Sequence, residues 1–409
     1  MAVQGRLNDI EAKVVAGERL DHADGLALYA CDDLAWLGHL AREAQRRRSG
    51  ETVMFNVNRH LNLTNVCVAS CKYCTFERKP GQLDAYTMRV DEAVGLAKQM
   101  EPEGLTELHI VNGLHPNLPF EYYPNTLRAL REALPHVALK AFTATEIDYF
   151  TQLTHRSADA IIDELIDAGL DSLTGGGAEI FAWDVRRRIV DHSTHWERWS
   201  EIHRIAHAKG LRTPATMLYG HIEEPRHRVD HVLRLRALQD ETGGFVTFIP
   251  LRFHPEGSRI QRPIATGAEA MRVFAVSRLL LDNFERLKCF WVMHGLTLSQ
   301  LLLEFGVDDL DGSVVEYKIT HDDATPDMLS RADLLRLIRE AGRVPVERDT
   351  RYRVLRTYPR EPGPGEPDGD LSLDTARLPL SSRDGAERPG PGAACCASGA
   401  TELPGLGTK

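Results

Sequence analysis

Three cysteines within eight residues have the type and spacing to hold a metal centre. Cys67, Cys71 and Cys74 form a Cys-x3-Cys-x2-Cys run in the segment NLTNVCVASCKYCTFER, with Tyr73 directly before the third cysteine. Thiolates are soft ligands that select iron–sulfur clusters, zinc or Cu(I). A structural zinc site takes a fourth Cys or His at short spacing, whereas the next histidine is His109. Three ligands would leave one iron of a cubane cluster open to a substrate.

The other four cysteines form no such pattern. Cys31 and Cys289 are interpreted as core thiols, and the adjacent Cys395 and Cys396 as inert residues of a polar tail. A disulfide framework would spread its cysteines along the chain, so this distribution favours a metal in a reducing compartment. A zinc knuckle and three buried free thiols remain open as alternatives for the crowded three.

The elements that must position these cysteines are short β-rich runs alternating with amphipathic helical stretches between about residues 53 and 320. This alternation is typical of a parallel sheet built from βα units and predicts a (β/α)8 barrel, with a partial six-stranded barrel as the alternative. Ser157 is expected to cap one helix. Capping boxes are expected at Thr266 with Glu269 and at Thr297 with Gln300. The expected strands begin near Val53, Glu107, Ala138, Asp171, Arg212, Gly244, Leu287 and Gly312.

The composition divides the chain into three regions. Residues 1–50 are expected to form an N-terminal helical extension, and residues 51–358 the barrel with a last helix over about Ser330–Ala341. Residues 359–409 are rich in Pro, Gly, Ser and charge. Such a segment buries too little apolar area to offset its ordering entropy, so we predict a disordered tail.

The charge balance narrows the possible partners. The chain has 49 Lys and Arg against 59 Asp and Glu, a formal net charge of −10. Nucleic-acid binders usually carry a basic stripe instead. No apolar run approaches the ~18 residues that span a bilayer, and the first 30 residues lack the apolar core of a signal peptide. We expect a cytoplasmic protein that binds neither nucleic acid nor membrane.

The Cys-x3-Cys-x-aromatic-Cys run resembles the motif of the radical S-adenosylmethionine (SAM) superfamily. The resemblance implies a full or partial (β/α) barrel and a 4Fe-4S cluster held by the three cysteines. It also implies that SAM chelates the open iron and is cleaved to methionine and a 5′-deoxyadenosyl radical.

Further segments of the chain are similar to those of the aminofutalosine synthase family, among them ELHIVNGLHPNLPFEYYP, LDSLTGGGAEIF, TMLYGHIEEPRHRVDHV and DGSVVEYKITHD. The resemblance covers roughly residues 50–355. It implies a transferase of menaquinone biosynthesis that joins the adenosyl fragment of SAM to 3-[(1-carboxyvinyl)oxy]benzoate. The product would be 6-amino-6-deoxyfutalosine, SAM would be consumed as a co-substrate, and a reduced flavodoxin- or ferredoxin-type protein would donate the electron.

Residues that follow the expected strands are candidates for binding SAM. In radical SAM proteins a Gly-rich turn after the second strand meets the methionine amino group, and backbone after the fifth strand meets adenine. A run of three glycines permits close approach of a ligand, and nearby carboxylates could accept from the ribose or the amine. The candidates are Tyr73, Asn112, Gly113, Glu146, Gly176, Glu179 and Tyr219.

The substrate implied by the resemblance carries two carboxylates, so cations should line its cavity. Arg suits this role because its fork binds a carboxylate bidentately. The candidates at strand ends are His221, Arg226, Arg252 and His294, together with His227 and His321. Two other functions stay open: a cyclase of the same pathway, which would abstract hydrogen without incorporating adenosine, and a non-catalytic iron–sulfur or zinc-binding scaffold.

Overall fold

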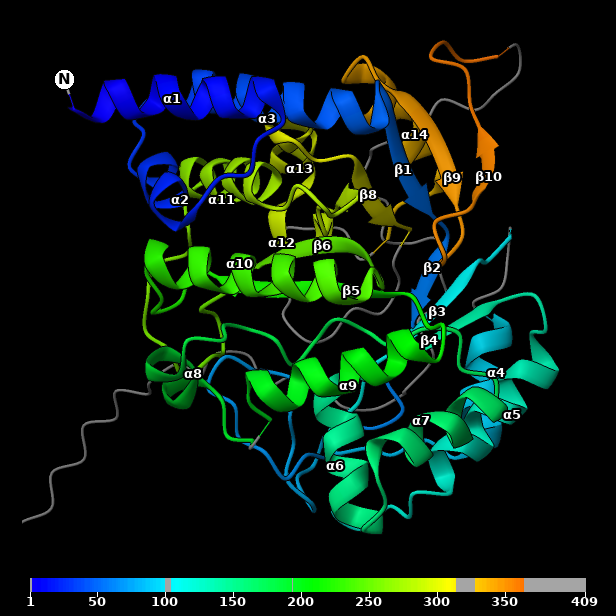
Figure 1. The fold of residues 1–409 in the computed structure, drawn as a ribbon. Helices are drawn as coiled ribbons and strands as arrows, with labels where there is room; N and C mark the ends of the chain where they lie inside the picture. The colour runs from blue at the N-terminus through cyan, green and yellow to red at the C-terminus, as the bar shows by residue number, and fades with distance from the viewer. Residues whose placement is uncertain (1, 100–103, 193, 314–327, 364–409) are drawn as a thin grey trace, which may run out of the picture. The chain divides into compact units, whose positions relative to one another are not determined.

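The computed structural model describes residues 2–99, 104–192, 194–313 and 328–363. Of the predicted tail, 359–409, the structure describes only residues 359–363, and Cys395, Cys396 and His321 lie outside the described residues. Three N-terminal helices are followed by strands that alternate with helices (Figure 1). No described helix is long and apolar enough to cross a membrane.

Eight parallel positions follow one another around the predicted (β/α)8 barrel. β1 pairs with β8, and β2 continues the same stretch of chain to pair with β3, which pairs with β4. Isolated bridges add the segment at Ser172 to β4 and join Lys288 after β7 to Asp309 of β8. The strands are β1 Thr52–Asn56, β2 Asn58–His60, β3 Glu107–Ile110, β4 Ala138–Ala141, β5 Thr213–Tyr219, β6 Phe245–Arg252, β7 Arg286–Leu287 and β8 Asp309–Gly312.

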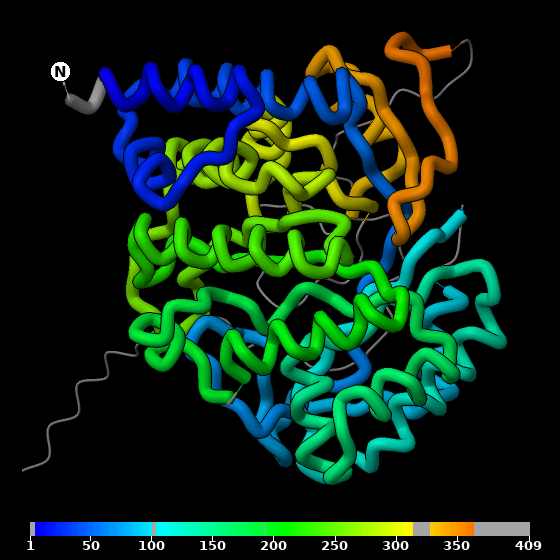
Figure 2. Tube along the Cα trace, viewed as in Figure 1, coloured from blue at the N-terminus to red at the C-terminus, as the bar shows by residue number. Residues whose placement is uncertain are grey.

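The chain returns to the start of the barrel at its described C-terminal end. β9 (Val344–Arg348) pairs in parallel with β1, and β10 (Val354–Thr357) pairs antiparallel with β9. Figure 2 shows the early β1 and the late β9 side by side, although they lie far apart in the sequence. The barrel interior near β1 is therefore also bounded by residues of β9.

Apolar residues at helical spacing direct each helix onto the outside of the barrel. α3 packs on α11, and α2 packs on α10 and α11, so the N-terminal helices lie against the barrel's own helices (Figure 1). The helices are α1 Ala2–Ala16, α2 His22–Tyr29, α3 Leu34–Ser49, α4 Val90–Gln99, α5 Tyr122–Ala133, α6 Ala144–Thr154, α7 Ala158–Asp167, α8 Trp183–Ile189, α9 Trp196–Ala208, α10 Pro225–Thr242, α11 Gly267–Leu280, α12 Trp291–His294, α13 Leu296–Leu302, the 3-10 turn η1 Leu303–Phe305 and α14 Arg331–Glu340.

Local signals predicted some boundaries correctly and others wrongly. Ser157 caps α7, and the Thr266 side chain caps α11 by accepting from the Glu269 N–H. The expected box is incomplete there, because the Glu269 side chain accepts from Arg228. The box expected at Thr297 is absent, because α13 begins after Gly295 and has no side-chain cap. Gly312 ends the eighth strand instead of beginning it.

Candidate active site

A cavity of about 250 Å³ opens at the C-terminal ends of the barrel strands. The carboxyl ends of parallel strands meet at one rim of a barrel, so loops distant in sequence contribute to one site. Most of the residues predicted for a cluster and SAM line this cavity. They are Cys67, Cys71, Tyr73, Cys74, Asn112, Gly113, Glu146, Gly176 and Glu179.

The cysteine loop is held by donors from outside it. The Lys79 ammonium donates to three successive carbonyls, those of Cys67 at 2.9 Å, Val68 at 3.1 Å and Ala69 at 2.8 Å. An ammonium has three N–H groups and no acceptor, so a single lysine can clamp three carbonyls. The backbone ahead of Cys71 is thereby fixed before any cofactor binds.

Two further segments tie down the second cysteine. The Asp191 N–H donates to Cys71 Sγ at 3.5 Å, and the Asp191 carboxylate accepts from the Ser70 N–H at 2.8 Å. Arg259 donates to the Cys71 carbonyl at 2.8 Å from the loop after β6. Donors to sulfur and fixed ligand backbones are features of iron–sulfur ligation.

The three thiols are suited to a cluster by their number and surroundings. Burial raises the pKa of the Cys71 thiol to about 12, because the charged form is desolvated. Such a thiol becomes a thiolate when a cation binds it. Apolar side chains of Ala69 and Leu114 pack beside it. Within the described residues, no three His, Cys, Asp or Glu side chains are gathered closely enough to hold one metal ion.

A carboxylate beside the cysteines is oriented from two sides. The Tyr73 hydroxyl donates to Glu179 Oε1 at 2.7 Å, and Arg186 donates to Glu179 Oε2 at 3.3 Å. Glu179 has φ +36°, a conformation that is uncommon outside glycine and costs energy. Because the side chain also lines the cavity, the fold holds a fixed acceptor toward a ligand.

A second buried carboxylate joins three neighbouring strand ends. Glu146 Oε1 accepts from the backbone and side-chain N–H groups of Asn112 at 3.1 Å, and Oε2 accepts from the Thr143 N–H at 2.7 Å. Thr143 and Glu146 form the capping box of α6. Asn112 Oδ1 in turn accepts from the Leu63 N–H at 2.7 Å. The carboxylate therefore positions Asn112 in the cavity wall.

Replacing Glu146 with glutamine is expected to lower the free energy of unfolding at pH 5 by about 1–3 kcal/mol, because an amide NH2 would face N–H donors. Burial raises the pKa of Glu146 to about 7, above its unfolded value, so protonation favours the folded state. The wild-type advantage is present below about pH 4.3 and lost as pH rises through 7. Denaturant unfolding of the wild type and Glu146→Gln across pH 5–8 measures how this advantage changes with pH. The exposed Glu132→Gln substitution is the control. A stability difference between the wild type and Glu146→Gln that did not change with pH would contradict the prediction.

The glycines at the rim are required by close packing of the protein itself. A Cβ at Gly113 would collide with the Val66 carbonyl oxygen, directly before the first cysteine. A Cβ at Gly176 would lie 2.8 Å from Thr143 Cγ2. Gly177 has φ +84°, which disfavours any side chain. These positions let three loops approach one another around the cavity.

Three residues predicted to bind SAM or substrate lie outside the cavity lining. The Tyr219 hydroxyl and His294 Nε2 are 3.1 Å apart, and His294 Nδ1 lies 2.9 Å from the Phe290 carbonyl. Arg252 donates to the Ala265 carbonyl at 2.9 Å. Leu218 and Leu251 line the cavity, so the alternation of side chains along a strand turns their neighbours Tyr219 and Arg252 to the opposite side.

The remaining predicted cations also have protein partners. His221 Nδ1 lies 3.1 Å from Glu223, and burial lowers its pKa. Arg226 is exposed in the first turn of α10, where it donates to Glu224 at 2.9 Å. His227 Nδ1 accepts from the Glu224 N–H. The cavity is lined by other cations, Lys140 and Lys288.

Residues inside the strands were missed by sequence reasoning. His60, His109 and Lys140 line the cavity from β2, β3 and β4, and Lys288 lines it directly after β7. The detectable signal was the polar residue beside apolar ones in β3 and β4, whereas β2 is polar throughout and gave no such contrast. That signal becomes specific only once the register of neighbouring strands is known.

The chain resembles known protein families over most of its length. Residues 61–235 match the radical SAM superfamily, and residues 242–361 match the CofH/MqnC C-terminal region. It is 65% identical over 368 residues to aminodeoxyfutalosine synthase of Streptomyces coelicolor, covering 87% of this chain and 95% of that protein. It is 44% identical over 362 residues to aminodeoxyfutalosine synthase of Thermus thermophilus, covering 87% and 97%.

A solved structure supports the fold. The FeFe-hydrogenase maturase HydG from Carboxydothermus hydrogenoformans superposes with a TM-score of 0.66 at 18% identity, covering 86% of this chain and 81% of that chain. At this identity the likeness concerns the barrel architecture alone.

Proposed function

Because the chain belongs to the aminodeoxyfutalosine synthase family of radical SAM enzymes, we propose that it joins the adenosyl fragment of SAM to 3-[(1-carboxyvinyl)oxy]benzoate. The product is 6-amino-6-deoxyfutalosine, an intermediate of menaquinone biosynthesis. Methionine and bicarbonate are released, and SAM is consumed in each turnover. A reduced flavodoxin- or ferredoxin-type protein supplies the electron.

The cluster and SAM are assigned to one end of the cavity. Cys67, Cys71 and Cys74 hold the 4Fe-4S cluster, which when bound supplies the electron that splits SAM. The side chains that line the wall beside these cysteines receive SAM. They are Tyr73, Asn112, Gly113, Glu146, Gly176 and Glu179.

The cavity suits a reaction that must be protected from water. The cavity has an apolar wall formed by Leu114, Ile249, Leu251 and Met293. Such a wall suits the aromatic ring of the proposed substrate. Addition of a primary carbon radical to an alkene needs contact between the two carbons and no acid or base. The protein therefore acts by holding the reactants in position and excluding solvent.

The observation that carries the proposal is the convergence of three thiols, two oriented carboxylates and a glycine run on one cavity. The direct test incubates the anaerobically reconstituted enzyme with SAM, dithionite and the enol-ether benzoate. Mass spectrometry should find 6-amino-6-deoxyfutalosine and methionine in equal amounts. Cleavage of SAM to 5′-deoxyadenosine without an adduct would instead support the cyclase reaction. Bound zinc without cleavage would support a scaffold.

A further inference from the structure

The cavity continues below the strand ends to a layer of polar side chains inside the barrel. The strand register pairs His60 with His109 and His109 with Lys140, so these three stand side by side on adjacent strands. Parallel neighbours in register point to the same face. All three line the cavity, and Lys140 precedes the last residue of β4. They therefore lie deeper than the thiols and Glu179, which follow strand ends.

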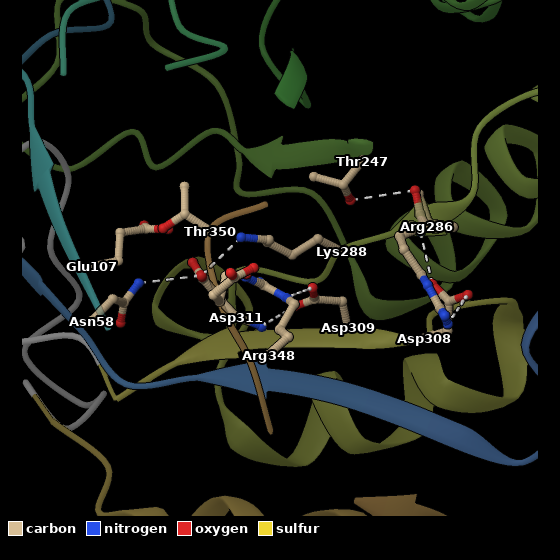
Figure 3. Close-up of polar contacts among 12 residues, drawn as sticks. Asn58, Glu107, Thr247, Arg286, Lys288, Asp308, Asp309, Asp311, Arg348 and Thr350 are labelled. Atoms are coloured by element: carbon tan, nitrogen blue, oxygen red, sulfur yellow. Dashed lines mark hydrogen bonds and ion pairs between the residues drawn. The ribbon is translucent and has the colours of Figure 1, made fainter. Parts of the chain in front are cut away.

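Two buried lysines, each paired with a buried carboxylate, bring ammonium groups into this layer. Lys288, 2% exposed, donates from Nζ to Asp311 Oδ1 at 2.9 Å, as Figure 3 shows. Lys140, 5% exposed, forms an ion pair with Glu107. An ammonium has three N–H groups, and the described residues give each lysine one carboxylate partner. Both side chains line the cavity, so each can offer a donor to a ligand there.

The same carboxylates are shared with other parts of the barrel. Asn58 Nδ2 donates to Asp311 Oδ1 at 3.3 Å, and the Thr350 hydroxyl donates to Glu107 Oε2 at 2.7 Å (Figure 3). These contacts fix Asp311 and Glu107, and through them the lysines. A site whose cations are held in place loses little conformational entropy when an anion binds.

The two histidines beside the lysines add an aromatic surface. Burial lowers the pKa of both His60 and His109, so they are neutral rings at neutral pH. Their rings stack with centroids 4.6 Å apart, and His60 stacks on Phe290 at 6.0 Å. A flat aromatic acid fits a site in which stacked rings adjoin two ammonium groups.

We propose that Lys140 and Lys288 bind the ring carboxylate of the benzoate substrate, with His60, His109 and Phe290 beside its ring. This inference rests on the proposed function, because it takes the substrate from it. The alkene must reach SAM at the strand ends, so the opposite end of the substrate, the ring carboxylate, extends toward the deeper layer. The acrylate carboxylate stays near the cysteine end of the cavity.

The test compares two variants that differ only at the lysine. Asp311→Asn removes the anionic partner alone, and asparagine tolerates the φ of +65° at this position. Lys288→Met/Asp311→Asn removes both charges, so no buried charge is left unpaired. Titration calorimetry under anaerobic conditions measures the dissociation constant for the substrate on the SAM-loaded, unreduced enzyme. Exposed Lys98→Met controls for loss of a lysine elsewhere.

The proposal gives different substrate affinities for the two variants. Asp311→Asn should bind the substrate as tightly as the wild type or more tightly, because Lys288 is freed. The double variant should bind about 10- to 100-fold more weakly, the loss expected for one charge-assisted hydrogen bond. Equal affinities of the single and double variants would overturn the assignment. Both variants should bind SAM as tightly as the wild type does. If the double variant lost as much affinity for SAM as for the substrate, the lysines would not be specific to the substrate, and the assignment would fail.

Two substrate analogues show which of the two substrate carboxylates the lysines bind. The double variant should also bind 3-(vinyloxy)benzoate, which keeps the ring carboxylate, more weakly than Asp311→Asn does. The two variants should bind 2-phenoxyacrylate, which lacks the ring carboxylate, equally well. The reverse result would assign the lysines to the acrylate carboxylate and overturn the proposed orientation. If the wild type itself binds none of these compounds, the proposed function fails instead, so the two failures are distinguishable.

Discussion

Replacing Cys71 with alanine is expected to abolish cluster assembly and turnover while the barrel stays folded. Two remaining thiolates, Cys67 and Cys74, offer too few ligands to retain a redox-active cubane. The fold should persist because Cys71 sits in a small satellite cluster with Ala69 and Leu114, apart from the main core. Iron and sulfide content, the visible absorption of the cluster and SAM cleavage are measured on anaerobically reconstituted protein, with circular dichroism for the fold.

The control for this substitution is a cysteine of the tail. Cys395→Ser, outside the described residues, should leave iron content and activity unchanged, because the sequence predicts no role for it. Cys71→Ala protein that still cleaves SAM would refute the ligand assignment. Loss of activity in Cys395→Ser would show that the tail contributes to catalysis.

Replacing Arg186 with methionine is expected to lower the free energy of unfolding by about 3–5 kcal/mol. The substitution leaves the buried groups that Arg186 contacts without their donor. Arg186 is 1% exposed and donates to the carbonyls of Gly177 and Ala178 at 2.7 Å and of Thr194 at 2.6 and 3.1 Å. Buried carbonyls without donors each cost free energy. Glu179 would also lose its ion pair at the cavity wall.

Urea unfolding followed by circular dichroism measures this loss. The neighbouring Arg187 offers a matched control, since it lies exposed on the same helix, α8. Arg187→Met should change the unfolding free energy by less than about 0.5 kcal/mol, as is usual for a surface position. Equal effects of the two substitutions would show that the contacts of Arg186 with the glycine loop contribute nothing to stability.

Local spacing was sufficient to predict the cysteine loop and most of the wall beside it. Cys67, Cys71 and Cys74 are separated by so few residues that any fold of the segment keeps them together. Asn112 lies in the loop after β3, and Glu146 lies in the first turn of α6 after β4. The strand ends of a parallel barrel share one rim. For these residues, position along the chain already implied position in space.

The predicted substrate cations show what position at a strand end leaves open. Arg252 and His294 also stand at or near strand ends, yet neither side chain lines the cavity: Arg252 donates to the Ala265 carbonyl, and His294 Nδ1 lies beside the Phe290 carbonyl. A charged residue after a strand can turn inward or outward, and the packing of the adjacent loop decides which. Sequence reasoning therefore located the rim and left open which side chains face its interior.

The sequence by itself determined the cysteine motif, the alternation of strands with helices and the family, because these depend on short-range spacing and residue type. The tertiary structure decided what the cavity contains. His60, His109 and Lys140 meet only through the register of three strands, and Lys288 reaches them only by closure of the barrel. Residues separated by more than two hundred positions thus share one site, and such a contact arises only when the chain is folded.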